Sequence, residues 1–86
     1  MGGEDKLQDL KDEIRDIDVK IVLLLNQRAD FSTELNNLKN KMGLPLYDKM
    51  EEMEIMEDLE DISAYTNMIS TVYPGIFKYS RSLYED

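Results

Sequence analysis

The sequence contains no histidine, cysteine or tryptophan, and only two prolines and four glycines among its 86 residues. Without cysteine, disulfides and thiolate sites are excluded. Without histidine, the common zinc sites, Ser-His triads and imidazole bases are excluded as well. A domain of this length hides only about 60% of its unfolded surface and usually needs a metal, a disulfide or a second chain for support. We therefore expect one domain that pairs with another chain.

Basic residues are outnumbered by acidic ones, with 10 Lys and Arg against 19 Asp and Glu and a formal net charge of −9. Such a charge repels phosphate backbones and anionic lipid headgroups, so we expect neither a nucleic-acid nor a membrane partner. No apolar run approaches the roughly 20 residues of a membrane span, and the first residues lack a basic and then apolar leader. These features predict a cytoplasmic protein.

A long helix is predicted from the apolar residues between positions 7 and 42, which recur with alternating spacings of three and four. The helix should run from about Glu4 to Met42, because that range contains no Gly or Pro. The remaining residues are too few to cover so long an apolar seam, so much of it should lie on another chain. The seam residues are Leu7, Leu10, Ile14, Ile17, Ile21, Leu24, Phe31, Leu35, Leu38 and Met42.

A turn and a short second helix should follow. Gly43 suits the end of the long helix as a C-cap residue, and Pro45 prevents an immediate restart. Asp48 with Glu51 three residues later indicates a capping box. The second helix is therefore predicted from about Lys49 to Asp61.

A third, medium-length helix is predicted after Ser63, which we interpret as its N-cap, and should extend to about Tyr84. Pro74 and Gly75 fall inside this helix, and the proline should kink it or split it in two. The expected architecture is all-α, with a long, a short and a medium helix.

Arg28 interrupts the apolar seam of the long helix, at a position where the pattern favours an aliphatic side chain. Burying a guanidinium costs several kcal/mol unless an anion meets it. One interpretation is an internal ion pair, for example with Asp18 or Glu52, or a polar residue that sets coiled-coil register. The other is that Arg28 binds an anionic ligand.

Two lysines lie beside the seam and favour the ligand interpretation. Lys39 is about 16 Å along the helix from Arg28, so the two side chains would reach opposite ends of one small molecule. In an antiparallel pair of chains related by a dyad near residue 22, Lys11 of the partner subunit would lie between them. Three converging cations would suit a small dianion. Taken singly, each lysine is also explained as a solvated surface charge.

Two further groups of side chains have ordinary interpretations. The segment 48–61 holds eight acidic residues among fourteen, with Asp48 and Glu52 on one helix face. Calcium binding there is conceivable, but the loop ligands and turn glycine of an EF-hand are missing, which favours a solvated face. A stripe on the third helix is most simply the edge of a core, and comprises Tyr73, Phe77, Ser80 and Tyr84.

Taken together, these motifs resemble the AroQ, or all-helical, class of chorismate mutases from Leu7 to Tyr84. The most specific stretches are ID-x-x-I-x-x-LL-x-x-R ending at Arg28, Lys39 before the GLP stretch, P-[IL]-Y-D-x-x-x-E around Asp48 and Glu52, and the late Ser80-Arg81. The resemblance implies that residues 1–86 form a single chorismate mutase-like helical domain, which assembles as an intertwined homodimer. It also implies the Claisen rearrangement of chorismate to prephenate, which needs no metal or cofactor.

Site roles follow from the resemblance for five matching positions. Arg28 would bind a substrate carboxylate, and Lys39 would reach the ether oxygen and a carboxylate. Asp48 and Glu52 would approach the ring hydroxyl, and Ser80 would contact a carboxylate. Such a site holds the flexible dianion in its reactive conformer and places positive charge where negative charge develops.

Three positions depart from the family pattern. Lys11 replaces an Arg that the family contributes across the dimer, which keeps the charge but loses the bidentate fork. Glu51 replaces an Arg, which reverses the sign beside a dianion site. Tyr84 replaces a Gln or Glu aimed at the ether oxygen, with Glu85 as a neighbouring candidate if the register shifts. These departures are consistent with reduced activity.

Two rival functions remain on sequence grounds. The same fold could carry a degraded site that binds an aromatic metabolite or a partner enzyme. Alternatively, the chain could be a purely structural acidic coiled coil in which Arg28 is paired internally.

Overall fold

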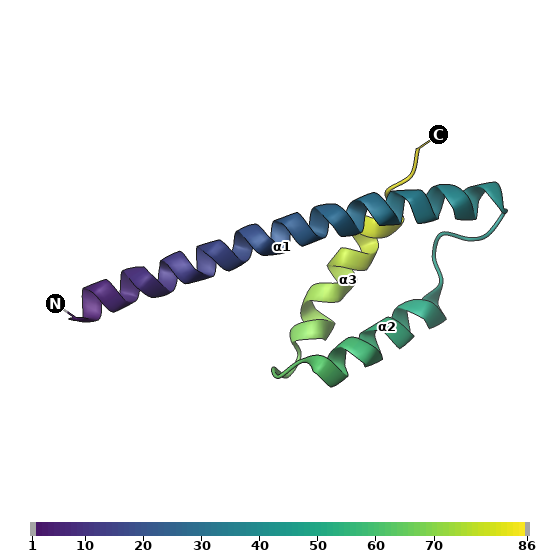
Figure 1. Cartoon of the computed structure of the whole chain (residues 1–86). Helices are drawn as coiled ribbons and strands as arrows, with labels where there is room; N and C mark the ends of the chain where they lie inside the picture. The colour runs from purple at the N-terminus through teal and green to yellow at the C-terminus, as the bar shows by residue number, and fades with distance from the viewer. Residues whose placement is uncertain (1, 86) are drawn as a thin grey trace. The chain divides into compact units, whose positions relative to one another are not determined.

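The computed structural model describes residues 2–85, which form three helices and no strand (Figure 1). The helices are α1 (Gly2–Lys41), α2 (Lys49–Ile62) and α3 (Met68–Arg81). This confirms the predicted all-α class and its three helices. The third helix is not longer than the second, since each has 14 residues. The intertwined homodimer stays a prediction. No helix in the described range is both long and apolar enough to span a bilayer.

α1 is a 40-residue helix whose ends lie within two residues of those predicted. Its charges complement the helix dipole, with Glu4 and Asp5 in the first turn and Lys39 and Lys41 in the last. The chain divides into two compact units inside this helix, one up to Asp30 and the other from Phe31 onward.

The predicted role of Gly43 as the residue that ends α1 is confirmed. Gly43 adopts a left-handed φ of 71°. Its N–H donates to the Asn40 carbonyl at 3.2 Å, and the Leu44 N–H donates to the Lys39 carbonyl at 2.8 Å. This pair of bonds is a Schellman motif, which satisfies carbonyls that the helix end would otherwise leave open. Lys39 is thereby fixed in the last turn of α1.

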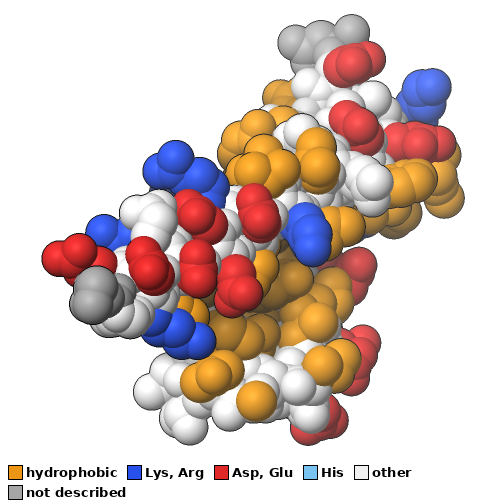
Figure 2. All heavy atoms as spheres, turned by 60° about the vertical axis from the view of Figure 1, so that its left-hand side comes forward, with side chains coloured by type: hydrophobic (Ala, Val, Ile, Leu, Met, Phe, Trp, Pro, Cys, Tyr) orange, Lys and Arg blue, Asp and Glu red, His pale blue; other side chains and the backbone are white. Residues whose placement is uncertain are grey.

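The first unit is a single helical segment, and most of its side chains are exposed. Ile14 is 60% exposed, Ile21 47% and Leu24 62%. Only Arg28 and Ala29 are half-buried among residues 2–30. Apolar side chains lie open on the face of the molecule drawn in Figure 2, among many acidic ones. The predicted seam is therefore not covered within this unit.

The second unit contains the end of α1, together with α2 and α3, which pack against each other. Ile69 and Phe77, both on α3, are the only buried apolar side chains among residues 2–85. The Tyr73 ring meets the Phe77 ring edge-on, with centroids 5.5 Å apart. Two buried apolar side chains make a very small core, so little hydrophobic burial supports a single copy of this chain.

The two ends of α2 are set by side chains that contact the backbone. At its start, Asp48 Oδ1 accepts from the Glu51 N–H at 3.1 Å, which confirms Asp48 as the N-cap. At its end, the Ser63 N–H donates to the Leu59 carbonyl at 3.0 Å. Ser63 is therefore the C-cap of α2, and its predicted role as N-cap of the third helix is wrong.

The reason lies in the loop between α2 and α3. The Ser63 hydroxyl accepts from the Tyr65 N–H at 3.2 Å and donates to the Tyr65 carbonyl at 3.0 Å. The side chain thus stabilises a local turn instead of a helix start. Asn67, with a left-handed φ of 66°, directly precedes α3 and caps it without a side-chain hydrogen bond. Asparagine tolerates this conformation better than most residues.

α3 runs through Pro74 as one element, so of the two predicted effects of the proline, a kink or a split, the split is wrong. A proline removes one backbone hydrogen bond, and the turns on either side of it retain theirs. The helix ends at Arg81, before the predicted Tyr84. Here the bonds shorten, with the Ser82 N–H donating to the Tyr79 carbonyl and the Leu83 N–H to the Ser80 carbonyl. Such three-residue spacings are typical of a terminating helix turn.

Candidate functional site

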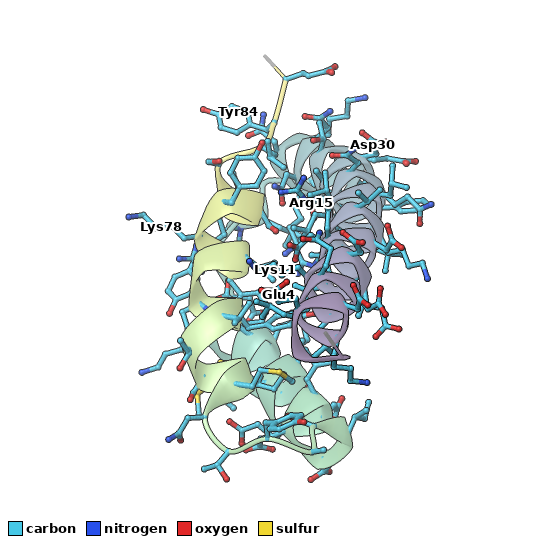
Figure 3. All side chains as sticks on the ribbon, turned by 90° about the vertical axis from the view of Figure 1, so that its left-hand side faces the viewer. Glu4, Lys11, Arg15, Asp30, Lys78 and Tyr84 are labelled. Carbon is cyan, nitrogen blue, oxygen red and sulfur yellow. The ribbon has the colours of Figure 1, made fainter. Side chains whose placement is uncertain are left out.

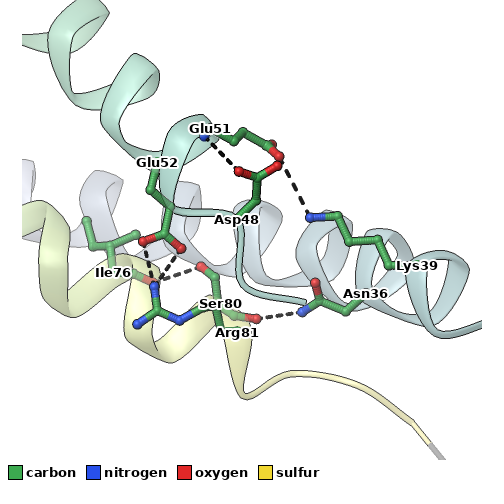
Figure 4. Close-up of polar contacts among 8 residues, drawn as sticks. All are labelled: Asn36, Lys39, Asp48, Glu51, Glu52, Ile76, Ser80 and Arg81. Atoms are coloured by element: carbon green, nitrogen blue, oxygen red, sulfur yellow. Dashed lines mark hydrogen bonds and ion pairs between the residues drawn. The ribbon is translucent and has the colours of Figure 1, made fainter. Parts of the chain in front are cut away.

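Polar side chains from all three helices meet in the second unit, where α1 ends, α2 begins and α3 ends (Figure 4). We call this group the polar cluster. Five of its six members were named by sequence analysis as site residues or as departures from the family pattern, and Arg81 was named without a role. The polar cluster consists of Lys39, Asp48, Glu51, Glu52, Ser80 and Arg81.

Lys39 lies against Glu51. Its Nζ is 3.8 Å from a Glu51 carboxylate oxygen. The Lys39 side chain is only 16% exposed, whereas that of Glu51 is 49% exposed. The residue that departs in sign from the family pattern therefore faces the cation expected to meet the substrate. Because Glu51 is half in solvent, its attraction for Lys39 is weak and open to displacement by a stronger anion.

Asp48 has a structural task at the start of α2. One of its oxygens, Oδ1, accepts the Glu51 N–H described above. The capping interaction fixes the carboxylate at the helix N-terminus, where the helix dipole favours negative charge. Since an ionised carboxylate has about four acceptor positions, capping leaves Asp48 able to accept further hydrogen bonds.

Glu52 is paired with Arg81. The Arg81 Nη1 donates to both carboxylate oxygens, at 2.6 and 2.5 Å. Both side chains are partly buried, with 32% of Arg81 and 21% of Glu52 exposed. The guanidinium carbon of Arg81 also lies 4.6 Å from the centre of the Tyr47 ring, a cation–π arrangement. Glu52 was predicted as one possible partner of Arg28. In the structure its carboxylate pairs with the guanidinium of Arg81.

Ser80 is placed beside this pair, near the end of α3. Its Oγ donates to the Ile76 carbonyl at 2.8 Å, one turn earlier in the same helix. This back-bonding is common for serine inside helices. To bind a substrate carboxylate as predicted, the Ser80 hydroxyl would have to rotate away from Ile76.

Tyr84 lies beyond the last turn of α3, next to the C-terminal tail (Figure 3). The helical spacing from Ser80 that suggested its role therefore does not hold in the structure. The Tyr84 side chain is 50% exposed. The neighbouring Glu85 is fixed through its backbone, since its N–H donates to Asn37 Oδ1 at 2.8 Å.

Sequence analysis missed Asn36, a buried polar residue that is only 5% exposed. Its Nδ2 donates to the carbonyl oxygens of Ser80 and Leu83, each at 2.7 Å. Asn36 thereby joins α1 to the end of α3, which carries Ser80 and Arg81. The one sequence feature that could have indicated a buried Asn36 was its position directly beside the seam residue Leu35. Nothing in the sequence indicated the hydrogen-bond partners of its amide.

Two predicted site residues lie in the first unit. Lys11 is exposed, and Arg28 is half-buried and makes contacts of its own. The structure describes their unit separately from the polar cluster, so the predicted convergence of cations stays a prediction.

Other hollows lie outside the polar cluster. One of about 350 Å³ opens on α1 in the first unit, where Lys11 is part of its lining, together with Asp12 and Arg15. A hollow of about 340 Å³ opens at the loop between α2 and α3, where its lining includes Glu60, Tyr65 and Asn67. No group of three or more acidic side chains within residues 2–85 is arranged to hold a metal ion.

Comparison with known proteins identifies the family. The family model described as chorismate mutase type II matches residues 10–85. The chain belongs to the chorismate mutase type II family. This confirms the resemblance to the AroQ class. The match covers the first unit from residue 10 onward and every member of the polar cluster.

Two curated relatives of this chorismate mutase family member show how distant the similarity is. A bifunctional chorismate mutase/prephenate dehydratase of Aquifex aeolicus is 33% identical over 73 residues, which cover 85% of this chain and 18% of that protein. A chorismate mutase of Methanocaldococcus jannaschii is 26% identical over 74 residues, which cover 86% of this chain and 75% of that protein. The chain thus spans less than a fifth of the Aquifex protein. No solved structure gives a significant match.

Proposed function

We propose that this chain is a chorismate mutase, an isomerase that converts chorismate to prephenate in the cytoplasm as a step toward the aromatic amino acids. The observation that carries the proposal is the family match across residues 10–85. The meeting of Lys39, Asp48, Glu52 and Ser80 in one polar cluster supports it, because these are four of the five positions that match the family pattern.

The rearrangement breaks the C–O bond of the enol ether and forms a C–C bond within one molecule, so it needs no nucleophile, metal or cofactor. The site has to hold the substrate in its compact conformer and stabilise the negative charge that develops on the ether oxygen. In our proposal Lys39 donates to that oxygen, and Arg28 holds a carboxylate. Asp48 and Glu52 accept hydrogen bonds from the ring hydroxyl of the substrate, and Ser80 donates a hydrogen bond to the second carboxylate.

We further propose that the enzyme is a homodimer. The exposed apolar side chains of the first unit, together with the very small core of the chain, favour burial against a second copy. In this arrangement Lys11 of the partner subunit completes each site. Tyr84 stays a proposed donor to the ether oxygen, with the tail beyond α3 as the segment that would carry it there.

The charges of the polar cluster predict weak substrate binding. Its two cations, Lys39 and Arg81, are outnumbered by the three carboxylates of Asp48, Glu51 and Glu52. A dianion would need the additional positive charge of Arg28 and of the partner's Lys11. We therefore expect lower activity than a site with arginine in place of Glu51 would have.

The test is an assay that follows the loss of chorismate and the appearance of prephenate with the purified chain. We expect turnover well above the buffer rate, and at least a 100-fold loss in the Arg28→Ala variant. Turnover no faster than buffer would exclude the enzyme.

A second candidate function is a binding module with the same fold and a degraded site. The 3.8 Å contact of Glu51 with Lys39 and the position of Tyr84 beyond α3 favour it. This candidate predicts that prephenate or another aromatic dianion binds while chorismate is not converted. Calorimetric titration with prephenate beside the turnover assay separates the two functions.

The purely structural alternative is tested by Arg28→Leu. This change should leave the free energy of unfolding equal or higher, because burying a charged pair costs about as much in desolvation as the pair gains. A lost affinity for prephenate is expected only if Arg28 binds the ligand. Unchanged affinity would favour a structural coiled coil.

A further inference from the structure

The pairing of Arg81 with Glu52 joins two helices at the centre of the polar cluster. Glu52 lies in the first turn of α2 and Arg81 is the last residue of α3. Both oxygens of the carboxylate accept from Nη1 of the guanidinium, and both side chains are largely withdrawn from solvent. A charge-assisted pair in such a setting restricts the orientation of both groups.

Tyr47 restricts the guanidinium further. The Arg81 carbon lies 4.6 Å from the centre of the ring, which therefore supports one side of the guanidinium plane while Glu52 holds one end. Arginine is suited to both interactions at once because its charge is delocalised over a flat group. The position of the Glu52 carboxylate thus depends on Arg81.

The ion pair leaves Glu52 able to accept further hydrogen bonds. An ionised carboxylate has about four acceptor positions, and Nη1 occupies two of them. A hydroxyl of a ligand can therefore still donate to Glu52 while the ion pair is intact.

The negative charge of Glu52 would repel a dianionic ligand, and the pairing with Arg81 neutralises it. Asp48 and Glu51 already supply two carboxylates to the polar cluster, and Lys39 lies nearest to Glu51. A doubly negative ligand beside an unpaired Glu52 would meet a third negative charge in a partly desolvated place, where repulsion is poorly screened. Beside the ion pair it meets a neutral unit.

We propose that Arg81 is a positioning residue of the substrate site, which orients the Glu52 carboxylate and cancels its charge so that a dianion can bind next to it. This rests on the proposed function, since it takes the polar cluster as the place where chorismate binds. Arg81 acts through Glu52 and need not touch the reacting atoms.

The experiment compares Arg81→Met, Glu52→Gln and the double variant with the unaltered chain. Calorimetry gives Kd for prephenate, a dianion that the site does not consume, and the chorismate assay gives KM and kcat. Arg81→Met should raise Kd and KM about tenfold or more, because a carboxylate is left without its partner. The double variant should regain most of the lost affinity, because no unpaired charge remains. The kcat of the double variant should be lower than that of the unaltered chain, because Glu52 is absent.

Two further variants serve as controls. Lys78→Met removes one positive charge from an exposed position on the same helix and should leave Kd within twofold of the unaltered chain. Arg81→Lys retains the charge without the planar fork and should recover part of the affinity. Circular dichroism establishes that each variant is helical. If Arg81→Met does not fold, Arg81→Lys with and without Glu52→Gln provides the same comparison.

The outcomes separate this inference from the proposed function. An unchanged Kd in Arg81→Met, or a double variant that binds no better than Arg81→Met, overturns the inference, because a merely structural role predicts additive losses. If the unaltered chain binds prephenate without converting chorismate, the proposed function fails and the Kd series still decides the role of Arg81. If it neither binds prephenate nor converts chorismate, both fail.

Discussion

The Nδ2 atom of Asn36 lies 2.7 Å from the carbonyl oxygen of Ser80 and donates a hydrogen bond to it. The same atom donates to the Leu83 carbonyl, so one buried amide fixes the end of α3 against α1. Ser80 and Arg81 belong to this end of the helix. The geometry of the polar cluster therefore depends on a residue outside it, whose side chain binds the backbone of Ser80.

Asn36→Ala should destabilise the chain by about 1–3 kcal/mol, because it removes the amide donor of two carbonyls in a poorly hydrated place, and only the Ser80 carbonyl keeps a second donor, the Leu83 N–H. Urea unfolding at a fixed protein concentration measures the change. Asn37→Ala is the matched control. It removes the acceptor of the exposed Glu85 N–H and should cost less than about 1 kcal/mol. Equal losses in the two variants would contradict the importance given to Asn36.

Glu51→Gln should strengthen substrate binding. The substitution removes a negative charge 3.8 Å from Lys39 and keeps the size of the side chain. We expect KM for chorismate to fall roughly three- to tenfold, with stability altered by less than about 1 kcal/mol because the pair is half-exposed. Steady-state kinetics and urea unfolding measure the two effects.

Glu54→Gln is the control for charge alone, since Glu54 is an exposed acid on the same helix. It should leave KM within a factor of two. A KM for Glu51→Gln no lower than that for Glu54→Gln would show that Glu51 does not oppose the substrate.

The parts of the fold that sequence predicts well are those set by neighbouring residues. The α1 bounds follow from a long apolar repeat without helix breakers, and the Gly43 and Asp48 caps act on backbone groups within five residues. Ser63 shows the limit of this approach. A serine between two helical patterns suits either a C-cap or an N-cap, and its bonds to Tyr65 decided between them.

The parts that sequence does not predict depend on contacts between distant segments. Asn36 and Arg81 meet partners that are 44 and 29 residues away along the chain. Neither pairing leaves a periodic signal. The position of Lys39 beside Glu51 was hidden for the same reason, because it needs the turn from Gly43 to Asp48 to bring α2 back toward α1. The residues of the polar cluster could thus be named from motifs, whereas their partners could not.

Ile14→Glu should weaken the proposed dimer. Ile14 is 60% exposed in the single chain, so the substitution has little effect on the protomer itself. In a dimer that covers the α1 seam, it would bury a carboxylate without a partner, and we expect dissociation at micromolar concentration. Sedimentation velocity measures the change. Glu13→Gln, at the adjacent exposed position, should leave the sedimentation coefficient unaltered. A monomeric unaltered chain would contradict the dimer.

Mixing two inactive variants tests whether the Lys11 of each site comes from the partner subunit. Lys11→Ala and Arg28→Ala should each lose most of the chorismate mutase activity. When they are unfolded and refolded together, heterodimers form in which one site combines an intact Arg28 with an intact Lys11 of the partner subunit. Statistical assembly predicts a recovery of about a quarter of the unaltered activity, because half of the dimers are mixed and each holds one complete site. A mixture of Arg28→Ala with Lys39→Ala is the control, since both residues are expected from the same protomer and no site becomes complete. Recovery in the control, or none in the first mixture, would mean that Lys11 does not act across the dimer.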